Sequence, residues 1–462
     1  MSDKLFSSRS LRQLIWPLIV EQLLSILLGM ADIVMVSSLG EAAVSGVSLV
    51  DSINVLLVEV FAALGTGGAV VAAQYIGRGE HGMASKTAKQ LLYTIVTVAI
   101  VLMVVCLVFY RQFLSLVFGR IDDDVMYNAR TYFLITILAL PALAVYNACA
   151  ALFRAQGNSR VSMLISLLVN ILNIGGNAFL LYGMHRGVEG AAIPTLISRT
   201  VAAVVLLVLL YRAKEYNGHR AISIKGISHI EFDGKLISRI LAIGVPNGLE
   251  NSMFQIGKIL VLSLIATYGT TAIAANAAGN TLASFEVLPG AAIGLAMLTV
   301  VGQCMGAGEQ EQAVYYTKKL MFIAYVSMIA LNIPLLALSY RIIKCYNLSP
   351  EATRLGWYMT LTHGLCAMVI WPLSFTLPNA LRAAGDASYT MIVSMISMWT
   401  VRIGMSYVFR GTDILGIQDM LDWPFSFGAL GVWFAMILDW IVRSACFIYR
   451  FKRGKWKQKK II

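Results

Sequence analysis

Two acidic side chains, Glu21 and Asp32, lie inside an apolar stretch of membrane-spanning length, residues 16–40. A carboxylate within the hydrocarbon of a bilayer is unfavourable unless it faces the protein interior or a water-filled cavity, so such an acid indicates a functional site. At about 100° per residue, the spacing of Glu21 and Asp32 places both side chains on nearly the same face of a helix. An ion pair with a nearby base is the alternative for each acid.

A second group of polar side chains, Asn170, Asn173 and Asn177, lies in the apolar stretch 160–182. Asn173 and Asn177 are four residues apart and are therefore neighbours on one helical face. Together with Asp32, two amide oxygens could form a small oxygen-rich site for a cation, or could hold the proton-accepting form of the carboxylate. Hydrogen bonds between helices, without any transported ion, are the alternative.

Polar side chains in two further stretches are candidates for the lining of a cavity. Asp51 lies in residues 46–76, either facing a cavity or near the outer end of a span. Gln255 belongs to a helical stripe of polar residues in 238–268, and Glu250 lies beside that stripe. We therefore expect the cavity lining to include Glu21, Asp51, Glu250 and Gln255.

Basic residues inside the apolar stretches require partners. Lys258 either neutralises Glu250 or Glu286 in a structural ion pair, or leaves that acid as the cavity fills. Asp439 and Arg443 are four residues apart in the last stretch and are expected to form an ion pair along one helix.

Membrane-spanning helices must hold these residues in place. The chain has 462 residues, of which 58% are hydrophobic and 13% charged, and its mean hydropathy is +0.75. Soluble globular proteins have about 25% charged residues. The apolar residues form runs of about 20, the length that crosses a bilayer core of about 30 Å. We predict an all-α integral membrane protein with twelve transmembrane helices, over residues 13–37, 46–76, 91–110, 127–150, 160–182, 189–211, 238–268, 272–304, 320–340, 355–380, 388–409 and 429–450.

Several classes of site are not indicated. The 6 cysteines occur singly and no Cys-x-x-Cys, His-Glu-x-x-His or Walker A sequence is present, which argues against a disulfide framework, a zinc site and ATP hydrolysis. Only one histidine, His363, falls in an expected span. A membrane-embedded enzyme would need acidic and histidine side chains converging at one membrane face, and the sequence offers no such cluster. We expect neither enzymatic activity nor a cofactor.

The net charge of +12 follows the expected membrane topology. With the N-terminus in the cytoplasm, most Lys and Arg residues lie at cytoplasmic ends of spans, which is the positive-inside bias. We therefore expect both termini in the cytoplasm of a multi-pass cell-membrane protein and no binding to nucleic acid. The basic tail Arg450–Lys460 either contacts anionic lipid or only anchors the last span.

An internal repeat relates the two halves of the chain at a spacing of 229 residues, as seen in Pro17 and Pro246, Glu21 and Glu250, Gly40 and Gly269, and the loops 74–80 and 303–309. Because six spans return the chain to its starting side, both halves share one orientation. Parallel repeats of this kind are typical of transporters, whose substrate site is expected near the middle of the membrane.

The repeat defines the expected domains, which are an N-terminal six-helix lobe (1–210), a basic cytoplasmic linker (211–235) and a C-terminal six-helix lobe with the basic tail (236–462). A longer outer loop, Arg410–Phe427, shifts the repeat register in the second half. Several glycines are expected to allow close helix packing, since no strand precedes them as a phosphate-binding loop requires: Gly65, Gly67, Gly68, Gly290, Gly294, Gly302 and Gly306.

Taken together, these motifs resemble those of the MATE (multidrug and toxic compound extrusion) family over nearly the whole chain. The motifs are the first-span pattern Pro17, Asp32, Gly40, the Gln-x-x-Gly-x-Gly-Glu loops at 74–80 and 303–309, Arg154-Ala-x-Gly-Asn with its partner at 382, and Gly190-Ala-Ala-Ile-Pro-Thr195. The resemblance implies two lobes that alternately open outward and inward, exporting organic cations in exchange for H⁺ or Na⁺.

The resemblance also implies roles for individual residues. Asp32 falls at the position of the family's first-helix coupling aspartate, and Asn173, Asn177 and Thr195 fall at positions of its ion site. If the protein is coupled to Na⁺, then Asp32, Asn173 and Asn177 would bind the metal ion. A monomer in the lipid membrane, without a cofactor, is implied.

Two departures separate this chain from some branches of the family. Phe254 stands where those branches have a seventh-helix glutamate, and no aspartate occurs between Trp357 and Asn379 in the tenth span. The pattern is similar to DinF-like bacterial members, with coupling in the first lobe. A flippase for a lipid-linked glycan is the alternative, although within the spans it could draw on few cations: Arg130, Arg199, Lys258 and Arg402.

Overall fold

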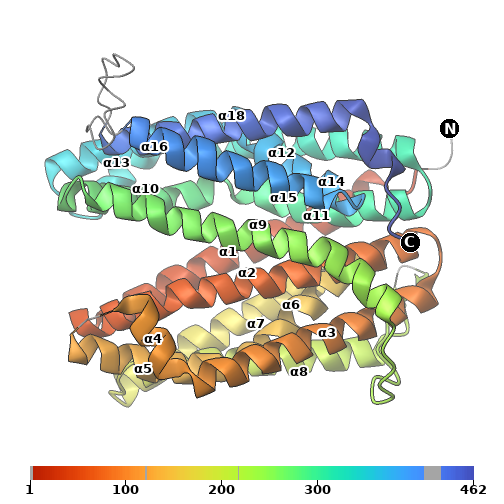
Figure 1. Cartoon of the computed structure of the whole chain (residues 1–462), viewed down its shortest axis with the longest axis horizontal. Coiled ribbons are helices and arrows are strands. Elements are labelled where there is room, and N and C mark those ends of the chain that lie inside the picture. The colour runs from red at the N-terminus through yellow and green to blue at the C-terminus, as the bar shows by residue number, and fades with distance from the viewer. Residues whose placement is uncertain (1–3, 120–121, 217, 410–427) are drawn as a thin grey trace. The chain divides into compact units, whose positions relative to one another are not determined.

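The chain folds into long helices, described by a computed structural model over residues 4–119, 122–216, 218–409 and 428–462 (Figure 1). In chain order the elements are α1 (Ser8–Ser37), α2 (Glu41–Gly77), α3 (His81–Val108), α4 (Tyr110–Phe118), α5 (Asp123–Leu138), α6 (Leu140–Ala155), α7 (Ser159–Asn177), η1 (Ala178–Gly183), α8 (Glu189–Arg212), β1 (Glu215–Tyr216), β2 (His219–Arg220), α9 (Gly234–Ala266), α10 (Thr270–Glu286), α11 (Leu288–Gly306), α12 (Gln310–Lys344), α13 (Pro350–Val369), η2 (Pro372–Thr376), α14 (Leu377–Ala383), α15 (Ala387–Ile396), η3 (Ser397–Ile403), α16 (Gly404–Val408), α18 (Ala429–Arg453) and η4 (Lys455–Gln458). The expected outer loop Arg410–Phe427 lies outside the described residues.

The prediction of twelve membrane-spanning helices is confirmed. In the described part of the chain, 10 helices are long and apolar enough to cross a membrane. Two helix pairs, α5 with α6 and α13 with the segment up to Ala383, are each long and apolar enough when taken together. The helices of these pairs meet at bends of 49° and 62°, respectively. Counting each bent pair as one span gives 12, in the order expected from the sequence.

Proline accounts for both bends. Pro141 lies in the first turn of α6, and Pro372 opens the π-helical segment η2. Proline lacks the amide hydrogen of an intrahelical bond and its ring clashes with the preceding turn, so it begins a helix but breaks one that is already running. These bends divide the fourth and tenth spans, which are equivalent positions in the two repeats.

Contacts divide the chain into two compact units. Unit 1 contains Met1–Gly248, Gly302–Glu309 and Ile461–Ile462, and unit 2 contains Leu249–Val301 and Gln310–Lys460. These units differ from the lobes expected at 1–210 and 236–462, because the linker, the first half of α9 and the end of α11 belong to unit 1. The linear repeat therefore does not coincide with the compact units.

Close backbone contacts at glycine explain this difference. A Cβ atom on Gly67 of α2 would lie 2.5 Å from the carbonyl oxygen of Ile240 in α9. A Cβ atom on Gly77 would overlap the carbonyl group of Gln303, and one on Gly306 would overlap that of Gln74. The end of α2 and the end of α11 thus pack backbone against backbone through repeat-equivalent residues, which confirms close packing at these glycines.

Substitution at this contact should show directly how much it contributes to the stability of the protein. We expect Gly306→Ala to destabilise the protein by about 1–3 kcal/mol, the usual cost of overpacking, since the added methyl group meets backbone. Gly29→Ala is the matched control, because nothing lies within 4 Å of that position in α1. Alanine there should be neutral or stabilising, by up to about 1 kcal/mol. Thermal unfolding of the purified protein measures both, and equal effects of the two changes would contradict the packing interpretation.

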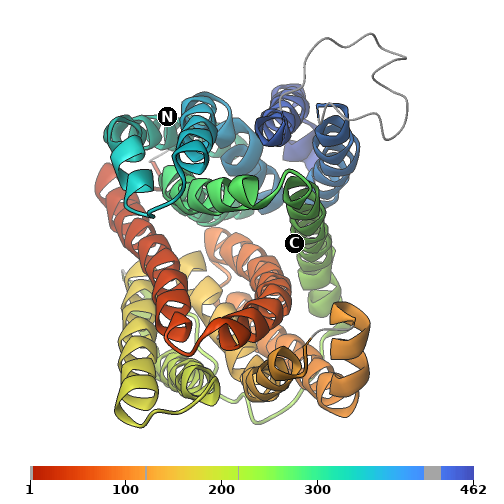
Figure 2. The same ribbon diagram turned by 90° about the vertical axis from the view of Figure 1, so that its left-hand side faces the viewer.

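Within unit 1, α2 packs against α3, α5 and α6, while α7 packs between α1 and α8. Figure 2 shows these helices nearly end-on. Small side chains fill the contact of α2 with α6: Ala69, Ala73, Ala151 and Ala155. The short side chains let the two helices approach closely, as is usual where lipid gives no hydrophobic drive for association.

Within unit 2, α13 packs against α10, α12 and α18. Its two main hydrophobic clusters contain Trp433 and Trp440 of α18. The glycine contacts predicted for this half are also present, because a Cβ atom on Gly294 would lie 2.6 Å from Nδ2 of Asn379 and one on Gly290 would overlap Trp371.

The expected linker belongs to unit 1, and its described residues are 211–216 and 218–235. β1 and β2 form an antiparallel pair, and the side chains of Ile222 and Ile224 are buried. Nε2 of Gln90 in α3 donates to the carbonyl oxygen of Glu231 at 2.6 Å, and the amide of Asp233 donates to Oε1 of Gln90 at 3.1 Å. The Lys86 ammonium, 2.6 Å from Asp233, holds the pKa of that carboxyl group below its usual range.

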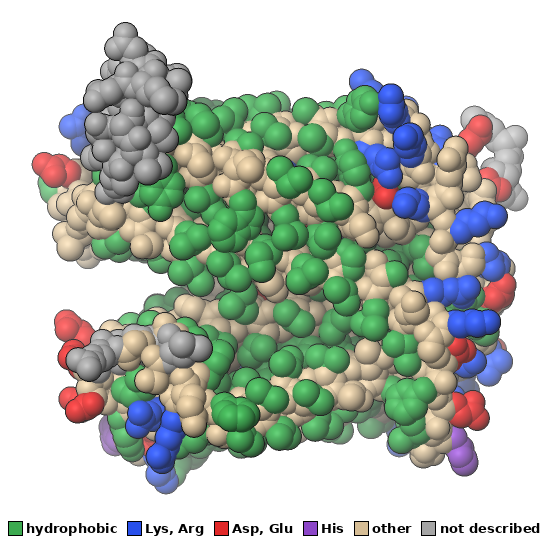
Figure 3. Space-filling view, in the orientation of Figure 1, with side chains coloured by type: hydrophobic (Ala, Val, Ile, Leu, Met, Phe, Trp, Pro, Cys, Tyr) green, Lys and Arg blue, Asp and Glu red, His purple; other side chains and the backbone are tan. Residues whose placement is uncertain are grey.

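Hydrophobic side chains dominate the flanks of the helices in each unit (Figure 3). Large apolar residues are exposed along several helices, including Val101, Val105, Ile171, Phe322 and Ile333. Such exposed apolar surface is expected of a protein whose solvent there is lipid.

Candidate functional site

A chain of hydrogen bonds starts at Asp32 in unit 1. Nδ2 of Asn177 donates to Oδ1 of Asp32 at 2.7 Å and lies 3.2 Å from Oδ1 of Asn173. Nδ2 of Asn173 donates to Oγ1 of Thr195 at 2.9 Å, and the Thr195 hydroxyl donates to the carbonyl oxygen of Ala191. The structure thus brings together the four residues expected to form the coupling site, while their role stays a prediction.

Three helices position these groups. α7 packs along both α1 and α8, and one helical turn separates Asn173 from Asn177. A Cβ atom on Gly176 would lie 2.7 Å from Cβ of Pro194, so α7 and α8 cross closely enough to bring Thr195 beside Asn173. Immediately after Asn177 the helix changes to the π-helical segment η1. Single π-helical turns in α-helices are frequent at functional sites.

One acceptor at this site has no partner. Oδ1 of Asn177 is buried and accepts no hydrogen bond within the described part of the chain. Asn173 and Asn177 are only 2% and 0% exposed, whereas Asp32 is partly exposed. A buried amide oxygen without a donor is unfavourable, so this atom is available for a proton or a cation held by Asp32.

A second acid and a base lie near Asp32. Nδ2 of Asn54 donates to Oδ1 of Asp51 at 3.3 Å, and the hydroxyl group of Tyr132 interacts electrostatically with this carboxyl group. The half-buried guanidinium group of Arg199 interacts electrostatically with both Asp32 and Asp51. The site therefore contains two carboxyl groups, Asp32 and Asp51, and one cation, Arg199. Sequence reasoning had not singled out Tyr132.

Glu21 takes part in a buried ion pair. Its Oε1 lies 2.7 Å from Nη1 of Arg154, and its Oε2 accepts a hydrogen bond from Ser162 at 2.6 Å. Only 6% of Glu21 is exposed. The ion pair raised as the alternative for this acid is the contact that the structure contains. Arg154 and Ser162 compensate its negative charge, so Glu21 contributes little negative electrostatic potential to a cavity.

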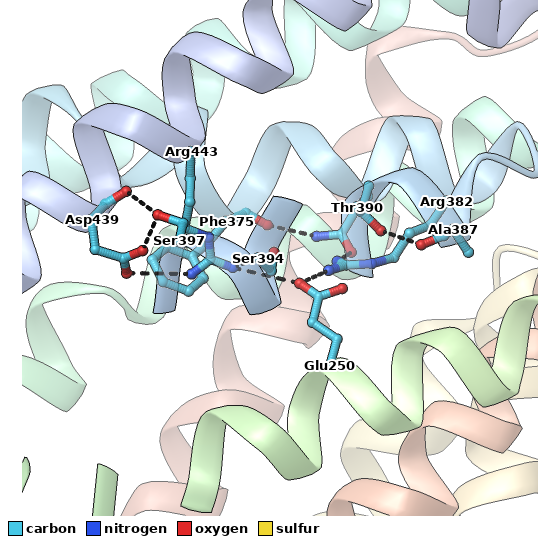
Figure 4. A network of polar contacts seen from close by, with 10 residues as sticks. Glu250, Phe375, Arg382, Ala387, Thr390, Ser394, Ser397, Asp439 and Arg443 are labelled. Atoms are coloured by element: carbon cyan, nitrogen blue, oxygen red, sulfur yellow. Dashed lines mark hydrogen bonds and ion pairs between the residues drawn. The ribbon is translucent and has the colours of Figure 1, made fainter. Parts of the chain in front are cut away.

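Glu250, the repeat equivalent of Glu21, lies in a larger network of unit 2. Oε1 of Glu250 is 2.7 Å from Nη2 of Arg382 and 3.5 Å from Nη2 of Arg443, and Figure 4 shows its side chain reaching from α9 between the two guanidinium groups. Arg443 also donates to Ser394 at 2.7 Å. Two arginines, one from α14 and one from α18, thus neutralise Glu250, and the role expected of Lys258 stays a prediction.

The last span contributes the other end of this network. Nη1 of Arg443 lies 3.8 Å from Oδ2 of Asp439, which confirms the expected ion pair along α18, and Ser397 donates to Asp439 (Figure 4). Phe254 lies under three cations, with Lys258 at 5.0 Å, Arg402 at 5.2 Å and Arg443 at 5.9 Å from its ring centre. Gln255, expected in the cavity lining, is partly exposed on α9.

Sequence reasoning missed the contact between a buried acid and a buried histidine in unit 2. Glu286, at the end of α10, contacts Nδ1 of His363 in α13, and both side chains are buried. The rings of Trp433 and Trp440 lie 5.5 Å and 5.0 Å from the His363 ring. The presence of a single histidine inside the spans was the available signal, but nothing in the spacing identified Glu286 as its partner.

The sequence model of the MatE family matches residues 17–179 and again residues 246–408. The two matches together cover more than half of the chain, and they are offset by the spacing of the internal repeat. The chain belongs to the MatE family.

Relatives in this family cover nearly the full chain. The probable multidrug resistance protein NorM of Thermotoga maritima is 25% identical over 460 residues, covering 98% of this chain and 94% of that protein. The multidrug export protein MepA of Staphylococcus haemolyticus is 22% identical, covering 85% of this chain and 84% of that protein.

Solved structures share the fold. An outward-facing multidrug resistance MATE transporter of the MOP superfamily has a TM-score of 0.86 at 18% identity, covering 98% of this chain and 97% of that one. A MOP superfamily transporter from Pyrococcus furiosus, described as having a binding pocket of reverse polarity, has the same TM-score, identity and coverage.

MatE membership confirms the resemblance seen in the sequence and the fold of twelve helices. The protein is a multi-pass membrane transporter of small molecules and not an enzyme. Within the described residues, no group of three or more His, Cys, Asp and Glu side chains could hold a metal ion.

Proposed function

We propose that the protein is a secondary antiporter that exports organic, cationic drugs or metabolites in exchange for inward H⁺ or Na⁺. The observation that carries this proposal is the hydrogen-bonded chain from Asp32 through Asn177 and Asn173 to Thr195. It joins α1, α7 and α8 to a single carboxyl group in a membrane-spanning segment. Such a group is expected at an ion pathway.

The hydrogen-bond pattern favours H⁺ as the coupling ion. An ionised carboxylate only accepts hydrogen bonds, whereas a protonated one also carries an O–H donor. Asn177 turns its NH₂ group to Asp32, which suits the ionised form. The proton of a neutral Asp32 would need an acceptor, and the unpartnered Oδ1 of Asn177 could provide one if its amide turned over.

Amide rotation would transmit the change of protonation. The NH₂ group of Asn177 would leave both Asp32 and Asn173, and Asn173 would then have to reorder its bond to Thr195. In this proposal, protonation favours the state that releases substrate, and loss of the proton favours the state that binds it. Binding of Na⁺ would need the same change at Asn177. A hard cation requires oxygen ligands, and Asn177 now presents its amide nitrogen, not its oxygen, to Asp32.

We propose a cell-membrane location, cytoplasmic termini and a monomeric state, as the sequence indicates. For the substrate cavity, Asp51 and Gln255 retain their proposed role, because each is partly exposed. Glu21 and Glu250 are compensated by arginines, so they would contribute to binding a cation only if those ion pairs opened. No cofactor is needed, since the ion gradient supplies the energy.

Buried cations favour a second candidate function, transport of molecules that carry an anionic group, including flipping of a lipid-linked glycan. Arg382, Arg402 and Arg443 are each at most 9% exposed, and among the described residues their acidic partners are Glu250 and Asp439. Nε of Arg402 is buried without a hydrogen bond in the described residues. The reverse polarity described for the Pyrococcus furiosus transporter gives a precedent in a similar fold.

Transport assays in proteoliposomes separate these possibilities. The purified protein is given either a pure H⁺ gradient or a pure Na⁺ gradient, with ethidium as the cationic probe and carboxyfluorescein as the anionic one. We expect ethidium transport driven by the H⁺ gradient. Transport driven by Na⁺ alone would reject H⁺ coupling, transport of carboxyfluorescein only would favour the second candidate, and no gradient-driven transport of either probe would reject antiport.

A further inference from the structure

A hollow of about 550 Å³ lies on unit 1 between the first turns of α3, the end of α8 and the linker. Among the described residues, its lining contains five basic side chains and one acid, Glu215. The basic residues, which we call the basic hollow, are Lys86, Lys89, Lys214, Arg220 and Lys225. Lys86 and Lys89 come from α3, and the other three come from the linker, more than a hundred residues further along the chain.

Specific bonds hold these segments together. The amide of Ser223 in the linker donates to Oγ of Ser85 in α3 at 3.1 Å, and the hydroxyl of Tyr93 donates to the carbonyl oxygen of Ile227 at 2.7 Å. Gly226 has a positive φ of 75° and brings the linker backbone beside Nζ of Lys89. The convergence of charge at the hollow is therefore built by the fold and is not a scatter of basic residues along a loop.

Most of the charge in the hollow is uncompensated. Lys86 forms an ion pair with Asp233 at 2.6 Å. In the described part of the chain, the other four basic side chains of the hollow form no ion pair, since no carboxylate oxygen lies within 4.0 Å of their nitrogen atoms. Cations gathered around one hollow repel each other, and an anion bound between them would remove that repulsion.

We propose that the basic hollow binds a phosphate-bearing anion. Lysine and arginine are the usual ligands of phosphate, and the volume lies in the range of small-molecule sites. The hollow lies where α3 begins and just after α8 ends, so it belongs to the region where these apolar helices would leave the membrane. There the anion is either the headgroup of an anionic phospholipid or a soluble phosphate compound, and both offer the same chemistry to the lysines.

The test uses the full-length protein and two charge-matched double variants. Lys89→Gln with Lys225→Gln removes two charges from the hollow. Arg212→Gln with Lys235→Gln removes two charges from exposed positions that do not line it. Binding is measured in detergent with inorganic pyrophosphate and glycerol phosphate. Nanodiscs of phosphatidylcholine, with and without phosphatidylglycerol, are then compared by native mass spectrometry of the lipids retained.

We expect the hollow variant to bind the anion roughly 10- to 30-fold more weakly than the wild type, as two lost surface charges imply, and the control to bind like the wild type. A variant with Lys89→Arg and Lys225→Arg keeps the charges and should bind normally, which separates lost charge from a folding defect. Retention of phosphatidylglycerol identifies a lipid, and binding of the soluble probes identifies a free phosphate compound. Equal weakening in the hollow variant and the control, or no binding to the wild type, would overturn the proposal.

Discussion

Replacing Asp32 by asparagine is expected to abolish gradient-driven export while leaving the protein folded. The amide is similar in shape to the carboxyl group, and the NH₂ group of Asn177 can still donate to its oxygen. What is lost is the change of charge that couples the ion to the conformation. A coupling free energy of 1–3 kcal/mol corresponds to about 5- to 150-fold, so we expect export to fall at least about tenfold.

Two readouts separate coupling from a general defect. Efflux of ethidium is measured at equal membrane levels, and ethidium binding is measured without a gradient, where Asp32→Asn should retain affinity. The matched control is Glu41→Gln at the exposed start of α2, which should export normally. Wild-type efflux in Asp32→Asn would remove this residue from the coupling mechanism.

Removing Glu250 should have the largest effect on stability. Glu250→Gln leaves Arg382 and Arg443 facing each other, both buried, without the carboxylate that now lies between them. Removing one partner of a buried ion pair typically costs about 3–5 kcal/mol, because an uncompensated charge remains in a medium of low polarity. Thermal unfolding of the purified protein measures the loss.

Two comparisons identify the cause of that loss. Glu21→Gln, the repeat-equivalent change, should cost less, because Arg154 has a more exposed side chain (18%) and is the only arginine bound to Glu21 in the described structure. The double change Glu250→Gln with Arg382→Gln should recover part of the stability, since one of the unpaired charges is removed as well. A Glu250→Gln protein as stable as the wild type would show that the network is not structural.

The sequence predicted the spans because their cause is local. A backbone in lipid must satisfy its own hydrogen bonds, so each apolar run of sufficient length becomes a helix whatever its neighbours are. The bends near Pro141 and Pro372 have an equally local origin in the missing amide hydrogen. The repeat at 229 residues was likewise readable from the sequence, and the two matches of the family model share that spacing.

The cluster at Asp32 was partly predictable. Helical spacing placed Asn173 and Asn177 on one face, and family resemblance added Thr195. The direction of the hydrogen bonds and the unpartnered oxygen of Asn177 were not predictable, because they depend on how closely α7 approaches α1 and α8. Gly176 and Pro194 set the α7–α8 part of that approach.

Glu21 and Asp32 illustrate the limit most clearly. By itself the sequence determined that both acids lie in the first membrane span, on one face, and that Glu21 has a repeat equivalent in Glu250 while Asp32 has none. Only the tertiary structure decided that Glu21 and Glu250 are held by Arg154 and Arg382, whereas Asp32 meets only an amide among the hydrogen bonds described. The reason is that helical periodicity fixes which face a residue occupies, but the partner on that face belongs to another helix more than a hundred residues away.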